Sequence, residues 1–472
     1  MAHFNELHFR RGLAMAFDAR TAALIAALLV NGSAMSAILT VTDTGDAGDG
    51  TCDATCTLRD AVNAAQADDR VLFDLALSSP IVIGLTGPAL QIDLPMRIVG
   101  TDGVRTTLRR TSGSGRLIDV LNGGDVRIVG LSFENGTAPS VPASGADGGA
   151  VFVAAGAALE LRDCVFRDNL AIAIASPPEV AMQGGTARGG AIYAEGDLLV
   201  ENCAFVGNLA QGGNGSSNVF LSGNAGGAAS GGAIHAIATA DILNSTFSGN
   251  RASGGDGGGG GIGMIGMPGF NGGDGGGASG GALAFSASAA PTLAFSTLIA
   301  NIVEPGDGGP GGPAGPPLMP ELPPPPNGAN GATGAARAAA IDSAATTIIN
   351  VSVIAANTGA TPCAGAALGA RTSNRVDDAS CPGIVVNALE TQFEPIDAQA
   401  DSPHFKPLFG SAAVDAAADC LDAVAFEVVD LDQLLTPRPL AGHGGALACD
   451  FGAIELNPVL FGDGFEEPPP PP

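Results

Sequence analysis

One short pattern recurs along the chain and constrains the fold more than any other feature. A small pair and an apolar pair, as in Gly-Gly-Ala-Ile, precede a segment that ends in Phe-x-x-Asn or a variant of it. The units begin at Gly148, Gly189, Gly231 and Gly280, with a degenerate fifth unit at Ala338. Spacing within the units is almost constant, whereas the stretches between them vary widely in length. Constant units with variable inserts predict stacked repeats that carry loops on one side.

Within the units, short runs alternate between apolar and polar residues. Residues 158–163, 197–202 and 240–245 read ALELRD, DLLVEN and ADILNS, and a period of two predicts strands. The chain has no Trp and one Tyr, so its core must use small and branched aliphatic side chains, which suit closely spaced strands. We therefore predict an all-β fold, a parallel β-helix in which each coil pairs with the next at about 4.8 Å.

In such a coil, equivalent side chains of successive units stack in columns. One inward column is predicted from the apolar residues Val151, Ile192, Ile234 and Leu283. A second is predicted from Phe166, Phe205 and Phe247. A corner column, in which each amide bonds to the next coil, is predicted from Asn169, Asn208, Asn250, Asn301 and Asn357. We interpret these columns as structural rather than catalytic.

Cys164 and Cys203 occupy equivalent places in neighbouring units. Their Cβ atoms would lie at the strand spacing, which is wider than the roughly 3.8 Å that a disulfide prefers. We therefore predict two buried free thiols, with a disulfide between them as the alternative. A nucleophilic role is disfavoured because no His would stack nearby.

The N-terminus has the pattern of an export signal. Arg10, Arg11 and Arg20 precede the apolar run Thr21–Val30, and small residues follow. We predict a signal peptide over residues 1–36, with translation starting at Met1 or Met15; a buried helix of a cytosolic protein is the alternative. Ten apolar residues are too few to span a bilayer, so no integral membrane segment is expected after cleavage, and the protein is expected to be secreted or to lie on the cell surface.

Export makes disulfides the natural reading of the other six cysteines. The predicted pairs are Cys52 with Cys56, Cys363 with Cys381 and Cys420 with Cys449. Zinc is disfavoured because the chain has five His and none lies near a Cys pair at ligand spacing.

The chain carries 47 acidic and 20 basic residues, a formal charge of −27. Nucleic-acid binding is excluded as a function because it needs clustered Lys and Arg. Polyanionic sugars would be repelled as well unless calcium bridged the charges.

Two long inserts, residues 252–279 and 303–337, are rich in Gly and Pro. They contain too few apolar residues to fold alone, so we expect low-complexity loops that protrude from one edge of the stack. The run GGDGGGGGI within the first insert resembles a calcium-binding nonapeptide, but it lacks the second acid and no tandem array follows. We expect no cofactor and no metal, with calcium as the alternative.

Over residues 148–357, the alternation of GGAI with FxxN resembles the repeats of polymorphic outer-membrane proteins. That is a surface family built on right-handed β-helices, so the resemblance implies a single-stranded right-handed coil. Residues 43–69, with CTLRDA at their centre, resemble the CSLREA-type domain at the head of secreted β-helical proteins. Residues 57–66 would form an amphipathic helix that caps the stack, with Leu58, Ala61, Val62 and Ala65 on one face.

The C-terminal region resembles the closing segment of choice-of-anchor families. The matching residues are Arg438, Pro439, Cys449, Asp450, Gly452, Ala453 and Glu455. The predicted domains are then the signal peptide, a CSLREA-type cap (37–70), the β-helix with its inserts (71–360), further coils with the anchor-like cap (361–456) and a Pro-rich tail (457–472).

Two functional hypotheses of different class follow. The first is an exported or cell-surface protein of structural or adhesin-like type, expected to be a monomeric rod that presents loops to a surface or carbohydrate ligand. The second is a polysaccharide lyase or glycoside hydrolase on a pectate-lyase-like β-helix, which would need converging carboxylates. Asp163, Glu201 and Asp241 lie near one flank but are expected to solvate the surface, and His235 is expected to face solvent. No residue is assigned a catalytic, cofactor-binding or metal-binding role.

Overall fold

The computed structural model of the chain describes residues 36–75, 81–101, 105–140, 145–175, 182–417, 420–421, 428–439 and 448–456. The predicted signal peptide, apart from Ser36, and the predicted Pro-rich tail lie outside these described residues. Within them, no helix is long and apolar enough to cross a membrane.

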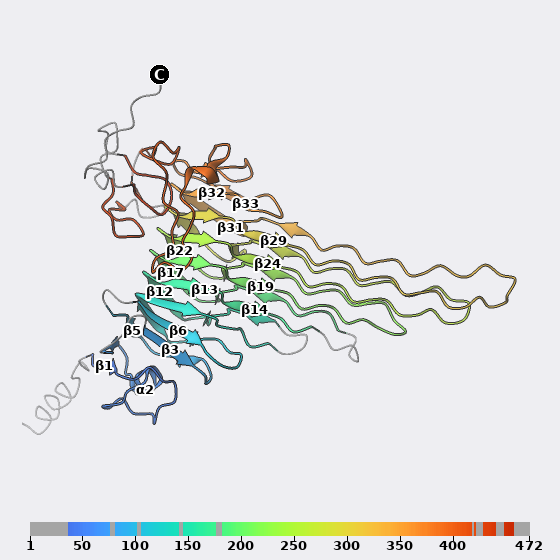
Figure 1. Ribbon diagram of the computed structural model, residues 1–472, viewed down its shortest axis with the longest axis horizontal. Helices are drawn as coiled ribbons and strands as arrows, with labels where there is room; N and C mark the ends of the chain where they lie inside the picture. The colour runs from blue at the N-terminus through green and yellow to red at the C-terminus, as the bar shows by residue number, and fades with distance from the viewer. Residues whose placement is uncertain are drawn as a thin grey trace, which may run out of the picture.

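A short helix covers the N-terminal end of a stack of strands (Figure 1). It is α2, Leu58–Ala64, and it packs against β1 (Ile38–Val41) and β4 (Leu90–Ile92). Thr57 is its N-cap and forms a reciprocal capping box with Asp60, which satisfies two amides of the first turn. The face formed by Leu58, Ala61 and Val62 is buried, as the amphipathic pattern predicted.

The strands form long parallel sheets. The first series is β1, β2 (Asp69–Phe73), β5 (Met96–Val99), β8 (Asp125–Val129), β12 (Ala158–Arg162), β17 (Asp197–Glu201), β22 (Ala240–Leu243) and β27 (Thr292–Ala294). The second is β4, β7 (Ile118–Val120), β11 (Val151–Val153), β16 (Ile192–Ala194), β21 (Ile234–Ala236) and β26 (Leu283–Phe285). The ten-residue β31 (Ile341–Asn350) pairs with both series and with β33 (Cys363–Gly369), so it joins them into one sheet.

Three further sheets complete each repeat. One contains β3 (Ile81–Leu85), β6 (Thr106–Arg110), β9 (Leu131–Glu134), β13 (Val165–Arg167), β18 (Ala204–Val206), β23 (Thr246–Ser248), β28 (Thr297–Ile299), β32 (Val353–Ala355), β34 (Arg375–Val376) and β35 (Ile384–Val385). Another contains β14 (Leu170–Ile172), β19 (Leu209–Gln211), β24 (Arg251–Ser253) and β29 (Ile302–Glu304). The last contains β10 (Ala146–Asp147), β15 (Ala187–Arg188), β20 (Ala229–Ser230), β25 (Ala278–Ser279) and β30 (Ala336–Arg337). The prediction of an all-β fold with parallel strands is confirmed.

The strand registers place equivalent residues of successive repeats over one another. Ile192 pairs with Ile234, and Phe205 pairs with Phe247. The buried rings of Phe166 and Phe205 stack with centroids 4.7 Å apart, and those of Phe205 and Phe247 with centroids 4.9 Å apart. Phe133 extends this column by one repeat, at 4.5 Å from Phe166. The core is therefore a set of columns, as the repeat predicted.

The corner column of asparagines is also present and mostly fully buried. In each repeat the side-chain nitrogen donates to the side-chain oxygen of the next Asn, at 2.9 to 3.0 Å. The backbone nitrogen donates to the same oxygen. The chain of contacts runs through Asn169, Asn208, Asn250, Asn301 and Asn357. Each Asn side chain is thus hydrogen-bonded to the Asn of the next repeat.

The C-terminal region differs from a simple continuation of the coils. After β35 and a short 3-10 helix (Leu389–Gln392), it runs back along the flank of the stack rather than only covering its end. Arg167 donates to the carbonyl of Ala398, and Thr246 donates to the side chain of Gln433. A second apolar cluster, which includes Phe405 and Phe451, forms between this region and the last repeats.

Candidate functional site

Three inserts project from one edge of the stack and together form a long arm (Figure 1). They are residues 212–228 between β19 and β20, residues 254–277 between β24 and β25, and residues 305–335 between β29 and β30. We call them the first, second and third inserts. Each one leaves the stack, turns and returns, so the arm consists of stacked hairpins. Sequence analysis predicted the second and third as loops and missed the first.

The inserts are ordered by hydrogen bonds that recur at every third residue. In the outgoing half of the second insert, a glycine at every third residue donates its amide to a backbone carbonyl of the following layer. The pairs are Gly254 to Glu304, Gly257 to Asp307, Gly260 to Pro310, Gly263 to Pro313 and Gly266 to Pro316. The glycines that follow donate to the first insert: Gly255 to Gly227, Gly258 to Asn224 and Gly261 to Leu221. The inserts do not stand as separate loops, because backbone pairing between them replaces the missing apolar core.

A period of three is that of the polyproline II helix, which has three residues per turn and no internal hydrogen bonds. Its amides are free to pair with neighbouring chains, and close packing of several such chains leaves room only for glycine at the contacts. A Cβ added to Gly258 would lie 2.0 Å from the carbonyl oxygen of Ser216, and one added to Gly255 would lie 2.1 Å from that of Gly213. The glycine content of the inserts is thus a packing requirement.

The remaining position of each triplet faces solvent and often carries a side-chain oxygen. Asn214 Oδ1 accepts from the Asp256 amide, and Asp256 Oδ1 accepts from the Asp307 amide, both at 2.9 Å. On the return side, Asp274 Oδ1 accepts from Ala332 at 2.8 Å. These oxygens satisfy amides that the backbone of the neighbouring insert does not reach, so Asp256 has a structural partner at the position considered for calcium.

The third insert forms the last layer, and two of its outward amides, on Gly311 and Ala314, are bonded within the insert. Asn330 Oδ1 accepts from Gly311 at 2.9 Å, and Asn327 Oδ1 accepts from Ala314 at 2.8 Å. Side chains of the same insert thus take the place of a further layer on this face, in the way that sheet edges are blocked against addition of another strand.

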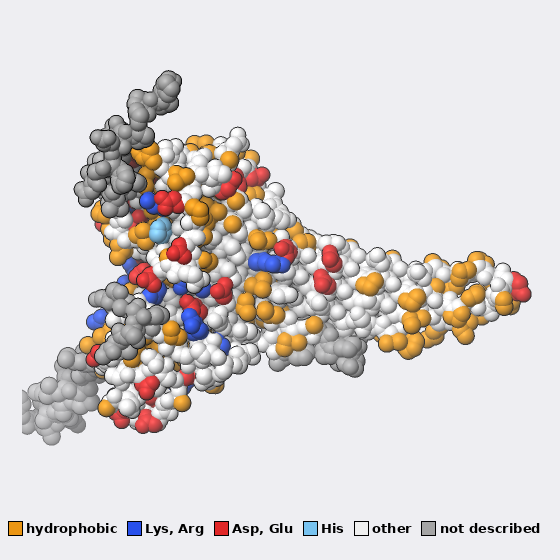
Figure 2. All heavy atoms as spheres, viewed as in Figure 1, with side chains coloured by type: hydrophobic (Ala, Val, Ile, Leu, Met, Phe, Trp, Pro, Cys, Tyr) orange, Lys and Arg blue, Asp and Glu red, His pale blue; other side chains and the backbone are white. Residues whose placement is uncertain are grey.

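Bulky apolar side chains lie at the turns of the inserts, and Figure 2 shows apolar atoms gathered along the distal part of the arm. All are between 49% and 66% exposed. They are Val219, Phe220 and Leu221 in the first insert, Ile262, Met264, Ile265 and Met267 in the second, and Leu318, Met319 and Leu322 in the third. The shafts are glycine and small polar residues, so exposed apolar area is concentrated at the turns.

A pocket of about 470 Å³ lies at the base of the arm. It opens where Ala284 stands in a column that otherwise reads Phe152, Tyr193, His235 and then Asp342. The small Ala284 side chain leaves a gap between the His235 ring and Asp342. Ser230, Ser279, Ser286 and Arg337 line the sides of the pocket.

His235 is half-buried in this pocket rather than facing solvent as the strand pattern suggested. Its Nδ1 contacts Ser230 Oγ at 2.8 Å, and its Nε2 contacts Ser286 Oγ at 3.3 Å. Burial, together with the nearby Arg188 guanidinium, lowers the pKa of His235 to about 4. The ring is therefore neutral at pH 7, and both of its nitrogens are engaged by serine hydroxyls, so no carboxylate orients it as a general base.

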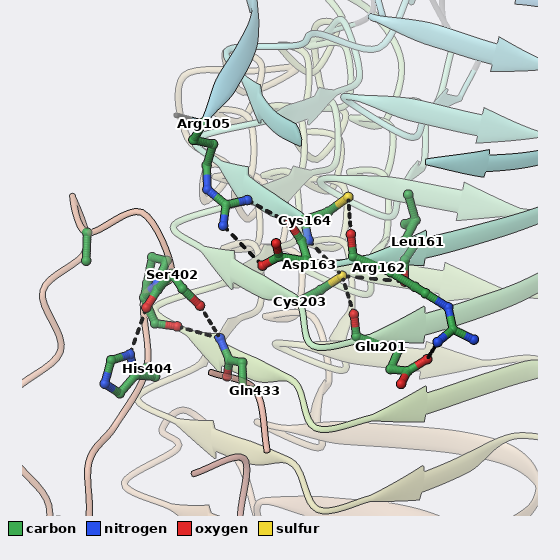
Figure 3. Close-up of polar contacts among 12 residues, drawn as sticks. Arg105, Leu161, Arg162, Asp163, Cys164, Glu201, Cys203, Ser402, His404 and Gln433 are labelled. Atoms are coloured by element: carbon green, nitrogen blue, oxygen red, sulfur yellow. Dashed lines mark hydrogen bonds and ion pairs between the residues drawn. The ribbon is translucent and has the colours of Figure 1, made fainter. Parts of the chain in front are cut away.

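The acids on the opposite flank have separate partners. Arg105 contacts Asp163 at 3.2 Å, and Arg162 contacts Glu201 at 2.6 Å (Figure 3). Asp241 accepts from the Thr292 hydroxyl at 2.6 Å. Among the described residues, no group of three His, Cys, Asp or Glu could hold a metal ion. Asp163 and Glu201 are therefore paired with arginines, whereas Asp241 is bonded to a neutral hydroxyl.

Cys164 and Cys203 are buried free thiols that lie one above the other (Figure 3). The Cys164 amide donates to Cys203 Sγ at 3.3 Å. Serines take the same role in later repeats. The backbone amide of Cys203 donates to Ser245 Oγ, and the backbone amide of Ser245 donates to Ser296 Oγ. Burial raises the pKa of the Cys203 thiol well above its usual range, so the sulfur acts as a structural acceptor and not as a thiolate nucleophile.

The six other cysteines form the pairs expected from their spacing. The disulfides are Cys52–Cys56, Cys363–Cys381 and Cys420–Cys449. Near the third of these, the anchor-like residues form a buried cluster in which Arg438 contacts Glu455 at 3.2 Å and donates to the carbonyls of Asp450 and Gly452. These residues hold the described part of the C-terminal region together.

No protein-family model matches the sequence, and a search of curated proteins finds no match.

Proposed function

We propose that this chain is an exported or cell-surface protein of adhesin-like type, built on a single-stranded right-handed parallel β-helix, and that the arm is its binding element. The observation that carries the proposal is the arm itself. Its third insert runs outward for about 15 residues, which at roughly 3.1 Å per residue places its turn about 45 Å from the stack. A display role requires such a rigid extension, and neither catalysis nor packing of the stack does.

The scaffold fixes the direction of the arm. The second insert begins directly after β24 and ends directly before β25, and both strands are paired on each side within their sheets. The insert continues the same layering, since Gly254 and Gly257 donate to the layer that follows. The stack and the arm are therefore one hydrogen-bonded structure, and the turns are presented at a defined distance and angle.

Export is supported by the three disulfides, which persist in oxidising compartments. It is supported as well by the resemblance of the repeats, the N-terminal cap and the C-terminal segment to secreted and surface-anchored families. On this proposal the ligand is a surface or a carbohydrate met outside the cell.

An enzymatic role on the same scaffold finds less support. A glycosidase needs two carboxyl groups within about 5 to 10 Å of one another across a substrate. Asp163 and Glu201 are each paired with an arginine, and Asp241 is bonded to a threonine. The pocket at the base of the arm contributes Asp342, which is paired with Arg337.

The experiment compares the full chain with a variant in which each of the three inserts is replaced by a short Asn-Gly turn. Both proteins are labelled and applied to a panel of intact bacterial and animal cells. The proposal expects cell binding by the full chain and its loss in the variant, while circular dichroism shows that the β-sheet content of the stack is kept. Equal binding by the two proteins would show that the arm is not the binding element.

A further inference from the structure

The apolar turns of the arm form one edge rather than three separate tips. The inserts contain 17, 24 and 31 residues in successive layers, so each hairpin is seven residues longer than the one before. Half of that increase falls on each side of the hairpin, which moves each turn about 10 Å further out than the last. Because each turn lies the same distance further out than the one before, and the layers are evenly spaced, the three turns lie along one inclined line.

This edge lies on the outside of the arm (Figure 2). The apolar side chains lie on the outside of the turns, and the turn of the first insert rests on the second: Ile262 donates its amide to the carbonyl of Val219. The third insert passes the second turn closely, because a Cβ on Gly266 would lie 3.2 Å from Leu318 Cβ. The apolar residues of the three turns therefore follow one another without a gap, and a flat surface can contact all of them at once.

The edge is almost free of charge. The three inserts contain no Lys and no Arg, and their acids are Asp256, Asp274, Asp307 and Glu321. The first three lie near the base of the arm, within four residues of a strand, and Glu321, between Met319 and Leu322, is the one acid at the edge. The chain as a whole carries a charge of −27, so anionic headgroups are repelled rather than attracted.

We propose that this apolar edge docks on the interface of a zwitterionic lipid bilayer, with the turn side chains buried at the boundary between headgroups and acyl chains. The inference rests on the proposed function and names the surface that the arm meets. A bilayer is flat, it accepts convex apolar groups, and a neutral headgroup matches an edge without cations. A second copy of the chain fits less well, because on the face of the last layer Asn330 and Asn327 already accept from the amides of Gly311 and Ala314.

The test is sedimentation of the full chain with phosphatidylcholine vesicles. The wild-type protein is expected to bind them, to keep binding in 1 M salt, and to bind no better when phosphatidylserine is added, because apolar burial carries the interaction. A variant with Phe220→Ser, Ile265→Ser and Leu318→Ser is expected to bind at least about tenfold more weakly, since each of these side chains transfers apolar area into the bilayer.

The matched control carries Ile38→Ser, Ile384→Ser and Val385→Ser. These residues are 48% to 58% exposed and lie outside the arm, so this variant is expected to bind vesicles as the wild type does. Failure of the wild type to bind phosphatidylcholine, or equal loss in both variants, overturns the proposal. So does a wild-type protein that is dimeric without lipid and becomes monomeric only in the turn variant, because the edge then meets a second copy.

Arm-dependent binding to cells without binding to vesicles also overturns this proposal and points to a protein or sugar receptor, but it leaves the adhesin-like function in place. Loss of arm dependence in the cell assay removes the proposed function itself. The two failures are therefore distinguishable.

Discussion

The side-chain nitrogen of Asn208 donates to the side-chain oxygen of Asn250 in the next repeat, at 2.9 Å. The same Asn208 side chain accepts from the backbone and side chain of Asn169 and donates to the carbonyl of Phe166. It is fully buried. One amide therefore satisfies polar groups in three successive repeats, which explains why this corner position is Asn in all five units.

Asn208→Ala is expected to lower the free energy of unfolding by about 3 kcal/mol, because several buried polar groups lose their partner at once. The measurement is the denaturant midpoint of the full chain. Asn214→Ala serves as the control, since Asn214 is exposed and accepts a single hydrogen bond. The free energy of unfolding of this variant should stay within about 1 kcal/mol of the wild-type value. Equal effects of the two substitutions would mean that the Asn column does not stabilise the stack.

Two adjacent glycines in the second insert are expected to respond oppositely to the same change. A Cβ on Gly258 meets the carbonyl of Ser216 at 2.0 Å, whereas on Gly259 the nearest atom is Ser217 Oγ at 3.4 Å. Gly258→Ala should make the arm sensitive to proteinase K, while Gly259→Ala should leave it as resistant as the wild type or slightly more so, because alanine lowers the entropy of the unfolded chain. Identical digestion of the two variants would contradict the packing of the inserts.

The column that contains Cys203 offers a second matched pair of substitutions. Cys203→Ser keeps an acceptor for the Cys164 amide and repeats the arrangement seen at Ser245, so it should change stability little. Cys203→Ala leaves that buried amide without a partner and should cost about 1 to 3 kcal/mol. The comparison is made by denaturant unfolding, and a more stable Ala variant would disprove the acceptor role of the sulfur.

The C-terminal region is expected to lose stability as the pH rises. Burial, and then the nearby Glu455, raises the pKa of Asp450 to about 7, against 3.8 for the ordinary group. The folded state therefore holds the proton more tightly, so this stabilisation is present at low pH and is lost as the pH rises through 7. Between pH 5 and pH 8 the change amounts to about 2 to 3 kcal/mol.

Calorimetric unfolding at the two pH values tests this expectation. The difference between them should shrink in Asp450→Asn, which does not titrate. The wild type and the variant would show the same pH dependence if Asp450 were ionised at pH 5 in the folded protein.

Much of the stack could be predicted because each unit of the repeat pairs with the next unit in register. Phe166, Phe205 and Phe247 occur at equivalent places in successive units, and parallel strands with a fixed number of residues per turn bring such residues together. The return of the C-terminal region along the flank could not be predicted in this way. Contacts such as Arg167 with Ala398 join residues far apart in the sequence, and no periodic pattern marks them.

The arm was missed for a different reason. Apolar periodicity reveals elements that bury side chains, whereas the inserts pack through glycine backbone and bury almost none. The signal was nevertheless present, since residues 327–335 read NGANGATGA, with glycine at every third position, which is the pattern of packed polyproline II chains. His235 was misplaced because strand alternation does not show that its neighbour in the next repeat, Ala284, is small enough to open a pocket.

Amide hydrogen exchange of the second and third inserts tests the central claim most directly. The account predicts that the donating amides in residues 254–263 and 305–316 exchange at least about 100-fold more slowly than an unstructured chain, because glycines spaced three residues apart donate to neighbouring inserts. Exchange of these segments at the rate of an unstructured chain would show that the inserts are independent loops, and the rigid arm would have to be abandoned.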